Sequence, residues 1–298
     1  MIKRGIKMVA RCLGYEINKI IPHAAPQNEA KSACVAFPAS LEPIWPLPRK
    51  ANGFTDSEIR HEFSRHLLWH YPYAFEGGLS FPISHSRPDA LINDPRRHFQ
   101  RFRHFMPYVL SSQGGSLKGK RILDIACNSG FWSIQCALLG AEVVGFDARI
   151  DMIAQADLIK SIIGLTNVTF KTLSISEMNQ RILGGTFDVV LNSGLLFHLP
   201  DPLEALRRTK EMSHDTILLD TAVFKSDNPI IYLRWEEPCD IWAANCSGIV
   251  AFPSRSGIDI MLRHLRMSNW LEIPNRTKDL PQDYLDHKRV SWLISVCS

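Results

Sequence analysis

The chain has 298 residues, of which 45% are hydrophobic and 21% charged, so its composition is that of a folded globular protein and excludes a disordered or fibrous one. A formal net charge of +4 permits an anionic partner but falls far short of a densely basic nucleic-acid-binding surface. Seven scattered cysteines form no CxxC pair, so we expect reduced thiols, a cytoplasmic location and no zinc knuckle.

Residues 1–50 are predicted to form an amphipathic helix followed by a proline-rich linker. The helix places four apolar residues on one face, namely Ile2, Ile6, Val9 and Leu13. It either packs on the protein or rests, through its cations, on an anionic membrane surface. Prolines recur between residues 22 and 48 and disfavour regular structure there.

Residues 51–115 are predicted to form a helical cap and substrate region. The spacing of apolar residues predicts helices over 55–69 and 95–110. The segment between them is aromatic and proline-rich, and we expect an irregular substrate loop in which Trp69 and Tyr71 contact the acceptor. His66 and His70 lie one helical turn apart, but no third ligand is near, so we expect no metal.

The run "RRHFQRFRHF" in the second of these helices is basic, with interleaved aromatic residues. A solvated helix face is the preferred interpretation, and an RNA-binding platform is the alternative.

Residues 116–298 alternate between strand and helix patterns. Strands are predicted at 121–126, 142–147, 167–172, 187–192 and 215–221, and helices at 130–139, 149–163, 202–212 and 256–267. This alternation predicts an open, mostly parallel, Rossmann-like α/β sheet with right-handed crossovers. The closing runs "NWLEIPN" and "KRVSWLISVC" predict an antiparallel hairpin at the sheet edge, with no helix between its strands.

The turn "DIACNSG" follows the first of these strands, where an open α/β sheet binds its ligand. The turn lacks the glycines of a G-x-G-x-x-G motif, and Asp124 would repel phosphates. A phosphate-free cofactor with a positive centre fits better, and S-adenosyl-L-methionine is such a molecule. We expect nearly extended backbone at Ala126, a positive φ at Asn128, and closest approach to the cofactor at Gly130.

A second acidic residue, Asp147, ends the next predicted strand about 20 residues beyond the turn, where an acid accepts hydrogen bonds from ribose hydroxyls.

Four segments carry a resemblance to a known family: "RILDIACNSGFWS", "FDVVLNSGLLFHLPDPLEALRRTKEM", "FPSRSGIDIMLRHL" and "HKRVSW". From about Trp69 onward the chain resembles the class I methyltransferases that form carboxymethyl and methoxy groups on tRNA wobble uridines, a family with small-molecule and glycan-methylating relatives. The resemblance implies S-adenosylmethionine contacts at Asp124, Gly130 and Asp147, and near Ser193 and Gly194. The acid that such enzymes often carry after the third strand is absent, because the run there is "LSIS".

Candidate catalytic residues follow the fourth and fifth strands. His198 is either a general base or a substrate contact, or it bonds the loop backbone. The run "YLRWEEPCDIW" alternates aromatic and charged residues in a way that suits a sugar; the alternative is an exposed insertion with a packed tryptophan. We assign Glu236 and Glu237 to catalysis. The acceptor contacts expected from this run are Arg234, Trp235 and Trp242.

Some members of this family use a carboxylated S-adenosylmethionine, held by a lysine, a tyrosine and an arginine. Arg289 matches the arginine, Phe197 stands at the tyrosine position, and the lysine has no counterpart. One donor of three would leave the extra carboxylate poorly paired, so we expect ordinary S-adenosylmethionine and transfer of a plain methyl group, with Arg289 and Phe197 facing the acceptor.

The expected function is O-methylation of a sugar hydroxyl on a glycan, glycolipid or lipo-oligosaccharide. Modification of tRNA wobble uridine is the alternative, and a non-catalytic binding module is a third reading. The expected partners are a small-molecule or glycolipid acceptor, with membrane contact through the first helix.

Overall fold

The computed structural model describes residues 39–84, 94–237, 248–267 and 269–296. These residues belong to one compact unit, Pro38–Ser298. The predicted N-terminal helix, most of the linker after it, and Trp242 lie outside the described residues.

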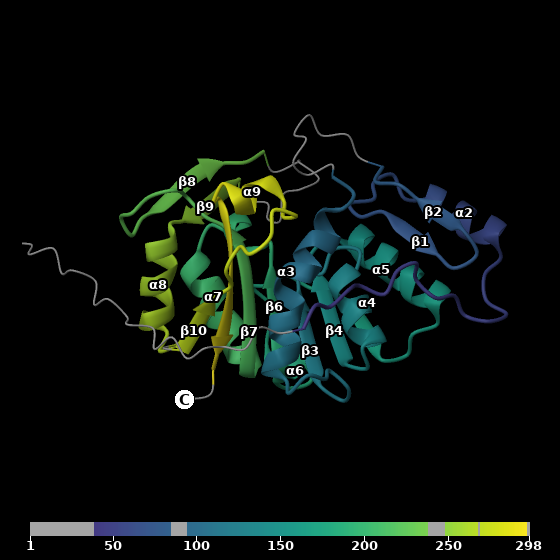
Figure 1. The fold of residues 1–298 in the computed structure, drawn as a ribbon, viewed down its shortest axis with the longest axis horizontal. Coiled ribbons are helices and arrows are strands. Elements are labelled where there is room, and N and C mark those ends of the chain that lie inside the picture. The colour runs from purple at the N-terminus through teal and green to yellow at the C-terminus, as the bar shows by residue number, and fades with distance from the viewer. Residues whose placement is uncertain (1–38, 85–93, 238–247, 268, 297–298) are drawn as a thin grey trace, which may run out of the picture. The chain divides into compact units, whose positions relative to one another are not determined.

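The centre of this unit is a seven-stranded sheet in the order β10-β11-β7-β6-β3-β4-β5 (Figure 1). The parallel strands are β3 (Arg121–Ile125), β4 (Glu142–Asp147), β5 (Val168–Thr172), β6 (Phe187–Ser193) and β7 (Ser213–Ala222). β10 (Asn269–Glu272) pairs antiparallel with β11 (Arg289–Ser295), which pairs antiparallel with β7. The predicted sheet and its terminal hairpin are therefore confirmed.

Helices cover both faces of the sheet. They are α4 (Phe131–Leu138), α5 (Ile150–Ile163), α6 (Gln180–Leu183), α7 (Pro202–Met212) and α8 (Arg255–His264). Successive residues of β3 point to opposite faces, so Ile122 joins one hydrophobic core and Leu123 the other. The side chain of Asp201 caps α7 by accepting a hydrogen bond from the Glu204 backbone, which explains where that helix begins.

The predicted cap packs into the first of these cores and consists of α2 (Asp56–Ser64), α3 (Arg97–Ser112) and a hairpin of β1 (Tyr73–Phe75) and β2 (Leu79–Phe81). Two expectations were wrong. The segment expected to be irregular contains this hairpin, and α2 ends before Trp69. The chain turns after Ser64 because Trp69 stacks on Phe63, with ring centroids 4.2 Å apart, and leaves Leu67 exposed.

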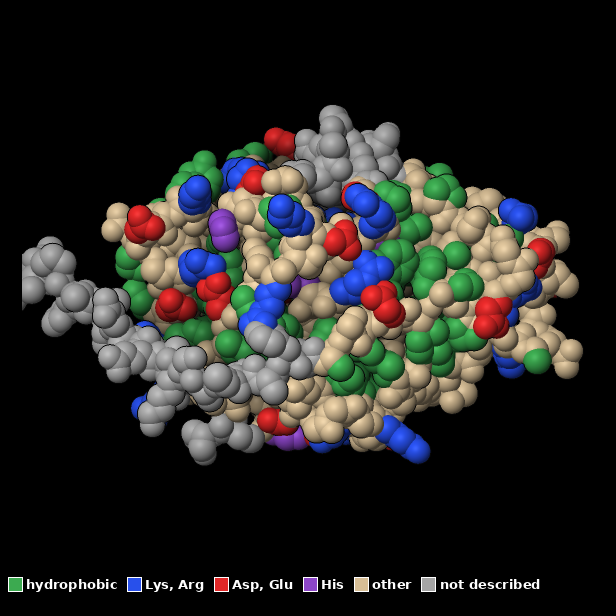
Figure 2. Space-filling model, in the orientation of Figure 1, with side chains coloured by type: hydrophobic (Ala, Val, Ile, Leu, Met, Phe, Trp, Pro, Cys, Tyr) green, Lys and Arg blue, Asp and Glu red, His purple; other side chains and the backbone are tan. Residues whose placement is uncertain are grey.

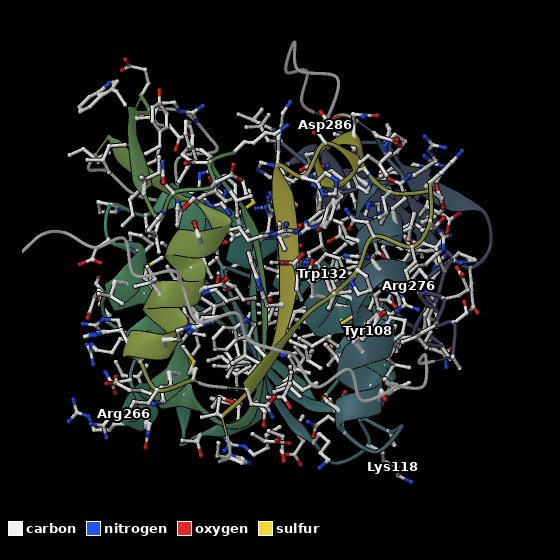
Figure 3. All side chains as sticks on the ribbon, turned by 60° about the vertical axis from the view of Figure 1, so that its left-hand side comes forward. Tyr108, Lys118, Trp132, Arg266, Arg276 and Asp286 are labelled. Atoms are coloured by element: carbon white, nitrogen blue, oxygen red, sulfur yellow. The ribbon has the colours of Figure 1, made fainter. Side chains whose placement is uncertain are left out.

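The interpretation of α3 as a solvated basic face was also wrong. Arg101, His98 and His104 are buried, and so are Phe102, Phe105 and Tyr108 of the same helix. Figure 3 shows Tyr108 of this helix and Trp132 of α4 inside the molecule, whereas Lys118 lies at its periphery. The cations of α3 that face inward are paired with acids of the sheet domain, as described below.

Two further elements were not predicted. β8 (Ile231–Trp235) and β9 (Ile249–Pro253) form a separate antiparallel ribbon, and β9 packs against the 3₁₀ turn η1 (Leu196–His198). A short helix, α9 (Gln282–Leu285), lies between β10 and β11, where no helix was expected. Both elements cover the carboxyl ends of β6 and β7, so they shape the candidate site.

Candidate active site

The turn after β3 contains three residues in the left-handed region: Ala126 at φ 56°, Asn128 at φ 53° and Gly130 at φ 84°. The expectation for Asn128 is confirmed, and its side chain accepts a hydrogen bond from the Ser129 backbone at 2.7 Å. The expectation of extended backbone at Ala126 was wrong. The turn tolerates this strained alanine because the next residue, Cys127, is bonded through its backbone N–H to Phe146 on β4.

Close packing around Gly130 leaves no room for a side chain. A Cβ at this position would lie 2.8 Å from Cζ of Phe170 and 3.1 Å from Cβ of Ala156. The glycine therefore lets α4 begin close against β5 and α5, and its approach to the cofactor stays a prediction.

Asp124 is buried, and its carboxylate faces the start of α4. It accepts hydrogen bonds from the backbone N–H and the hydroxyl of Ser133, at 3.1 and 2.6 Å. Burial raises the pKa of this carboxyl to about 7, although the bonds from Ser133 oppose the shift. In this arrangement Asp124 fixes the turn to the helix; a direct contact with the cofactor stays a prediction.

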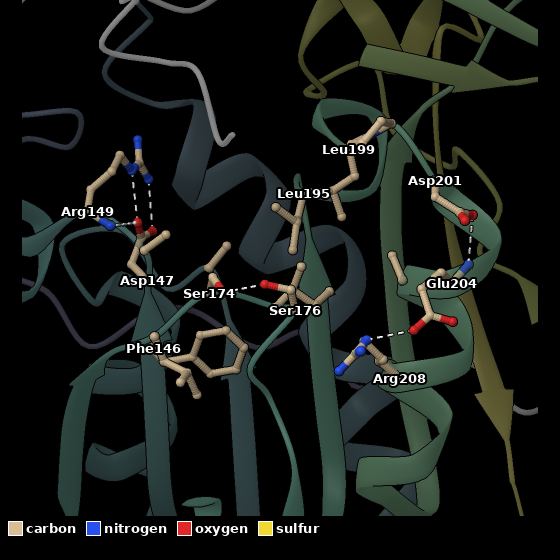
Figure 4. Close-up of a pocket in the computed structure, with 16 residues that line it drawn as sticks. Phe146, Asp147, Arg149, Ser174, Ser176, Leu195, Leu199, Asp201, Glu204 and Arg208 are labelled. Carbon is tan, nitrogen blue, oxygen red and sulfur yellow. Dashed lines mark hydrogen bonds and ion pairs between the residues drawn. The ribbon is translucent and has the colours of Figure 1, made fainter. Parts of the chain in front are cut away.

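Asp147 lies at the carboxyl end of β4, as expected, and both of its oxygens are occupied (Figure 4). The Arg149 guanidinium donates to them from Nε and Nη2, each at 2.8 Å, and the backbones of Arg149 and Asn128 donate at 3.0 Å. A ribose diol has two O–H donors that can replace the two guanidinium donors. Asp147 can thus hold a ribose once Arg149 moves aside.

A pocket of about 460 Å³ opens beside Asp147, between the carboxyl ends of β4, β5 and β6 and the start of α7 (Figure 4). Its apolar lining consists mainly of Phe146, Leu173, Ile175, Leu195 and Leu199. Ala126 and Asp147 are the predicted site residues that reach it. Its size and apolar walls suit a nucleoside, with Ser174 and Ser176 in place of the missing acid.

A second pocket, of about 120 Å³, lies on the other side of the turn and is lined by Tyr71, His98, Arg101 and Asn128, among others. Nε2 of His98 is buried and has no hydrogen-bond partner in the part of the chain that the structure describes. Burial, reinforced by the charge of Arg101, lowers the pKa of His98 to about 3, so the imidazole is neutral. The pocket combines the Asp94 carboxylate with N–H and O–H donors of Tyr71, Arg101 and Asn128, and these donors suit a carboxylate.

A buried charge network that the sequence analysis missed joins α3 to the sheet. Arg101 Nη2 and Arg289 Nη1 both contact Asp220 Oδ1 at 2.7 Å, while Tyr284 and Ser291 donate to its other oxygen. Burial raises the pKa of Asp220, but the two arginines outweigh it and hold that pKa well below its usual range. An acid in the middle of the apolar run "ILLDTA" was the available signal.

The predicted residues Ser193 and Gly194 lie against this network. The Ser193 hydroxyl accepts a hydrogen bond from Arg101 at 2.6 Å, and Gly194 lies beside both arginines. Arg289 also donates from Nε to Asp283 at 3.0 Å. Its guanidinium is thus held by two acids and is poorly placed to pair with a further carboxylate.

The ribbon brings two predicted catalytic residues together. Glu236, directly after β8, places Oε2 3.4 Å from Nδ1 of His198 on η1. The His198 ring also packs on Phe197, with centroids 4.0 Å apart. Glu237 does not join this pair, because it accepts a hydrogen bond from Nε1 of Trp235 at 3.1 Å.

The other predicted acceptor contacts divide into two groups. Phe197 and Arg234 lie near the pair: the Arg289 guanidinium stacks on Phe197, and that of Arg234 stacks on Phe252 of β9. Trp69 does not lie near the pair. It is buried in the cap, and its Nε1 donates a hydrogen bond to the backbone of Phe63, which leaves no face for a substrate.

Among the described residues, no group of three His, Cys, Asp or Glu side chains is arranged to hold a metal ion. In the same part of the chain, no helix is both long and apolar enough to cross a bilayer.

The open sheet with its antiparallel edge and the paired pockets at the carboxyl ends of its strands define a class I methyltransferase fold. Residues 116–260 match a family model described as a methyltransferase domain. The chain thus carries a methyltransferase domain over residues 116–260, and its sheet has the class I methyltransferase fold.

Relatives and solved structures extend this result. The tRNA U34 carboxymethyltransferase of Campylobacter hominis is 26% identical over 145 residues, 48% of each chain. The ubiquinone biosynthesis O-methyltransferase of Paraburkholderia phymatum is 31% identical over 121 residues, 40% of this chain and 51% of that one. The chain thus spans about half the length of these relatives. The N-terminal domain of EvdMO1, crystallised in the presence of SAH and D-fucose, shares the fold: TM-score 0.63, 20% identity, 83% of this chain and 98% of that one.

Replacing Gly130 tests the packing role of the turn. We expect Gly130→Ala to lower the free energy of unfolding by about 2–5 kcal/mol, because it combines a left-handed φ with a clash against Phe170. Gly119→Ala is the matched control, since it has φ 73° and open space around its Cβ, and it should cost only about 1–2 kcal/mol. Equal losses in urea unfolding would rule out the clash.

The raised pKa of Asp124 predicts a pH-dependent stability. Between its ordinary value of about 3.8 and about 7, the folded protein holds a proton that the unfolded chain has released. Stability therefore falls as pH rises through this window, by up to about 1.4 kcal/mol per pH unit. Asp124→Asn keeps the bonds to Ser133 and should remove this component of the slope. Parallel pH profiles of unfolding free energy for the two proteins would contradict the assignment.

Asp147→Ala should weaken S-adenosylmethionine binding by about 1.5–3 kcal/mol, the loss expected for a charge-assisted hydrogen-bond site. Glu142→Ala, at the exposed start of the same strand, is the control and should leave affinity unchanged. Unchanged affinity of a folded Asp147→Ala variant in calorimetry would remove this carboxylate from the cofactor site.

Proposed function

We propose that the protein transfers the methyl group of S-adenosylmethionine to a sugar hydroxyl on a glycan, glycolipid or lipo-oligosaccharide in the cytoplasm. The observation that carries this proposal is the pairing of His198 with Glu236 at the carboxyl end of the sheet. A hydroxyl is a poor nucleophile until a base takes its proton, and an imidazole oriented by a carboxylate is such a base.

The cofactor would span the two pockets. Its nucleoside fits the larger one, with the ribose on Asp147, and its amino-acid end fits the smaller one, where Tyr71, Arg101 and Asn128 offer donors to the carboxylate. The sulfonium then lies over the turn after β3, near Ser193 and Gly194. This placement directs the methyl group toward the side on which η1 and the ribbon lie.

In the reaction, the acceptor oxygen attacks the methyl carbon in line with the sulfur. The new O–C bond forms as the S–C bond breaks, and the sulfur keeps the bonding pair to leave S-adenosylhomocysteine. His198 accepts the hydroxyl proton, and the Glu236 carboxylate stabilises the resulting imidazolium.

Two observations support a sugar acceptor and a plain methyl group. The EvdMO1 domain, whose fold this chain shares, was crystallised with D-fucose. The donors that would hold an extra carboxylate on the cofactor are poor here, because Arg289 is held by Asp220 and Asp283, and Phe197 has no hydroxyl.

Modification of tRNA wobble uridine is the second candidate, favoured by the curated relatives of that name. The surface offers it less support. Two cations of α3, Arg97 and Arg101, are committed to Asp283 and Asp220. On the face shown in Figure 2, Lys and Arg side chains alternate with Asp and Glu in the described part of the surface.

Labelled S-adenosylmethionine tests the two candidates directly. The purified protein is incubated separately with a neutral glycan pool, a glycolipid extract and bulk tRNA. We expect label in a glycan or glycolipid, with little dependence on salt, because few phosphates are contacted. Label in tRNA that falls steeply with salt would overturn the sugar proposal in favour of tRNA.

Neighbouring acids provide a matched test of the catalytic pair. Glu236→Gln should lower turnover at saturating acceptor about tenfold or more, and His198→Ala about 100-fold or more, with cofactor affinity unchanged in both. Glu237→Gln should stay near the wild-type rate, because that carboxylate bonds Trp235 and not His198. Near-normal turnover of His198→Ala, or equal effects of the two glutamate variants, would leave His198 only a structural role.

A further inference from the structure

Strand β8 is exposed along its whole length, which is unusual for a run as apolar as Ile231–Trp235. Leu233 and Trp235 are 60% and 61% exposed, and Ile231 and Ile249, the latter paired with Trp235 across the ribbon, are exposed as well. Most other large apolar side chains of the described chain are buried in the two cores. An exposed cluster of apolar side chains of this kind marks a surface that binds a partner.

The strand also has a free edge. Within the described residues β8 pairs only with β9, and the hydrogen bonds that flank the ribbon fix which groups face β9. The Glu236 N–H donates to Gly248 O at 2.8 Å, and Ser254 N–H donates to Ile230 O at 2.9 Å. Even-numbered residues of the strand thus point their N–H and C=O groups at β9.

The backbone groups of odd-numbered residues alternate with these and point to the open edge. Ile231, Leu233 and Trp235 therefore present their N–H and C=O groups there, and no described residue bonds to them. The edge contains no proline or lysine, and its one charged residue, Arg234, stacks on Phe252 of β9.

We propose that β8 pairs with β8 of a second copy of this chain, antiparallel about a two-fold axis at Leu233. Leu233 would then face its own counterpart, and Ile231 would face Trp235 of the other copy. Each of these pairs would exchange two backbone hydrogen bonds, so every unpaired group on the edge finds a partner. Such pairing makes one continuous four-stranded sheet from the two ribbons.

The side chains fit this register. On the outward face, the aliphatic residues of one copy meet the aliphatic and indole groups of the other, which removes apolar surface from water on both. On the inner face, Tyr232 meets Arg234 of the other copy, a favourable cation–aromatic contact that keeps the two arginines from facing each other. A single two-fold axis therefore pairs the open backbone groups of the edge and gives the side chains on both faces of the strand a partner.

The interface would lie one residue from Glu236, whose carboxylate contacts His198. The ribbon is thus held on its inner side by the turn that carries His198 and on its free edge by the second copy. The inference concerns assembly and does not depend on the acceptor proposed above.

Sedimentation velocity of the full chain over a range of concentrations tests the pairing. The wild type should sediment as two chains. Leu233→Lys places two cations opposite each other across the axis and should raise the dimer dissociation constant at least about tenfold. Leu67→Lys is the matched control, because Leu67 is 89% exposed on the cap, and it should stay dimeric. A monomeric wild type, or a dimer that Leu233→Lys leaves intact, would overturn the proposal.

Amide hydrogen exchange provides an independent test of the β8 pairing in the wild-type protein. In the dimer, the amides of Ile231, Leu233 and Trp235 should be protected, and dilution should expose them while Tyr232 and Arg234 stay protected by β9. If the odd-numbered amides exchange fast at every concentration, β8 is not the interface, even if the protein proves dimeric through another surface.

Discussion

The site depends on one buried carboxylate. Asp220 lies at 0% exposure and accepts hydrogen bonds from Arg101 of α3, Tyr284 of α9, and Arg289 and Ser291 of β11. A carboxylate without these partners would cost several kcal/mol to bury, and losing one partner of a buried ion pair typically costs 3–5 kcal/mol. The network therefore fixes the cap helix and the terminal strand to β7, and with them the position of Ser193 and the small pocket.

Much of the sheet domain could be predicted because its signals are local. Apolar runs of five to seven residues alternate with amphipathic stripes, and Asp201 with Pro202 marks the start of α7. The turn was recognisable for the same reason, since Asn128 and Gly130 are residues that tolerate a positive φ. Ala126 could not be predicted this way, because its conformation is imposed by bonds between the turn and β4 rather than by its own preference.

The parts that could not be predicted rest on contacts between distant residues. Arg101 and Asp220 are 119 positions apart, and His198 and Glu236 are 38 apart. A basic helix with aromatic residues has the same local pattern whether its arginines face water or a buried acid, so α3 was misassigned. The ribbon that carries Glu236 also begins in a segment of β-branched and aromatic residues that the sequence analysis treated as a ligand-binding insertion. Only the fold shows that Glu236, and not Glu237, reaches the histidine.

The two pockets that flank the turn after β3 are lined by different charged residues. On one side, Arg97, Arg101 and Arg289 pair with Asp220 and Asp283 next to the small pocket, which Arg97, Arg101 and Asp94 line. On the other side, Asp147 lines the large pocket. In the proposed binding mode, the cofactor's carboxylate would lie toward the arginines of the small pocket and its ribose toward Asp147. If the cofactor binds as proposed, the buried network that holds the cap in place would also help to orient it with the methyl group toward His198.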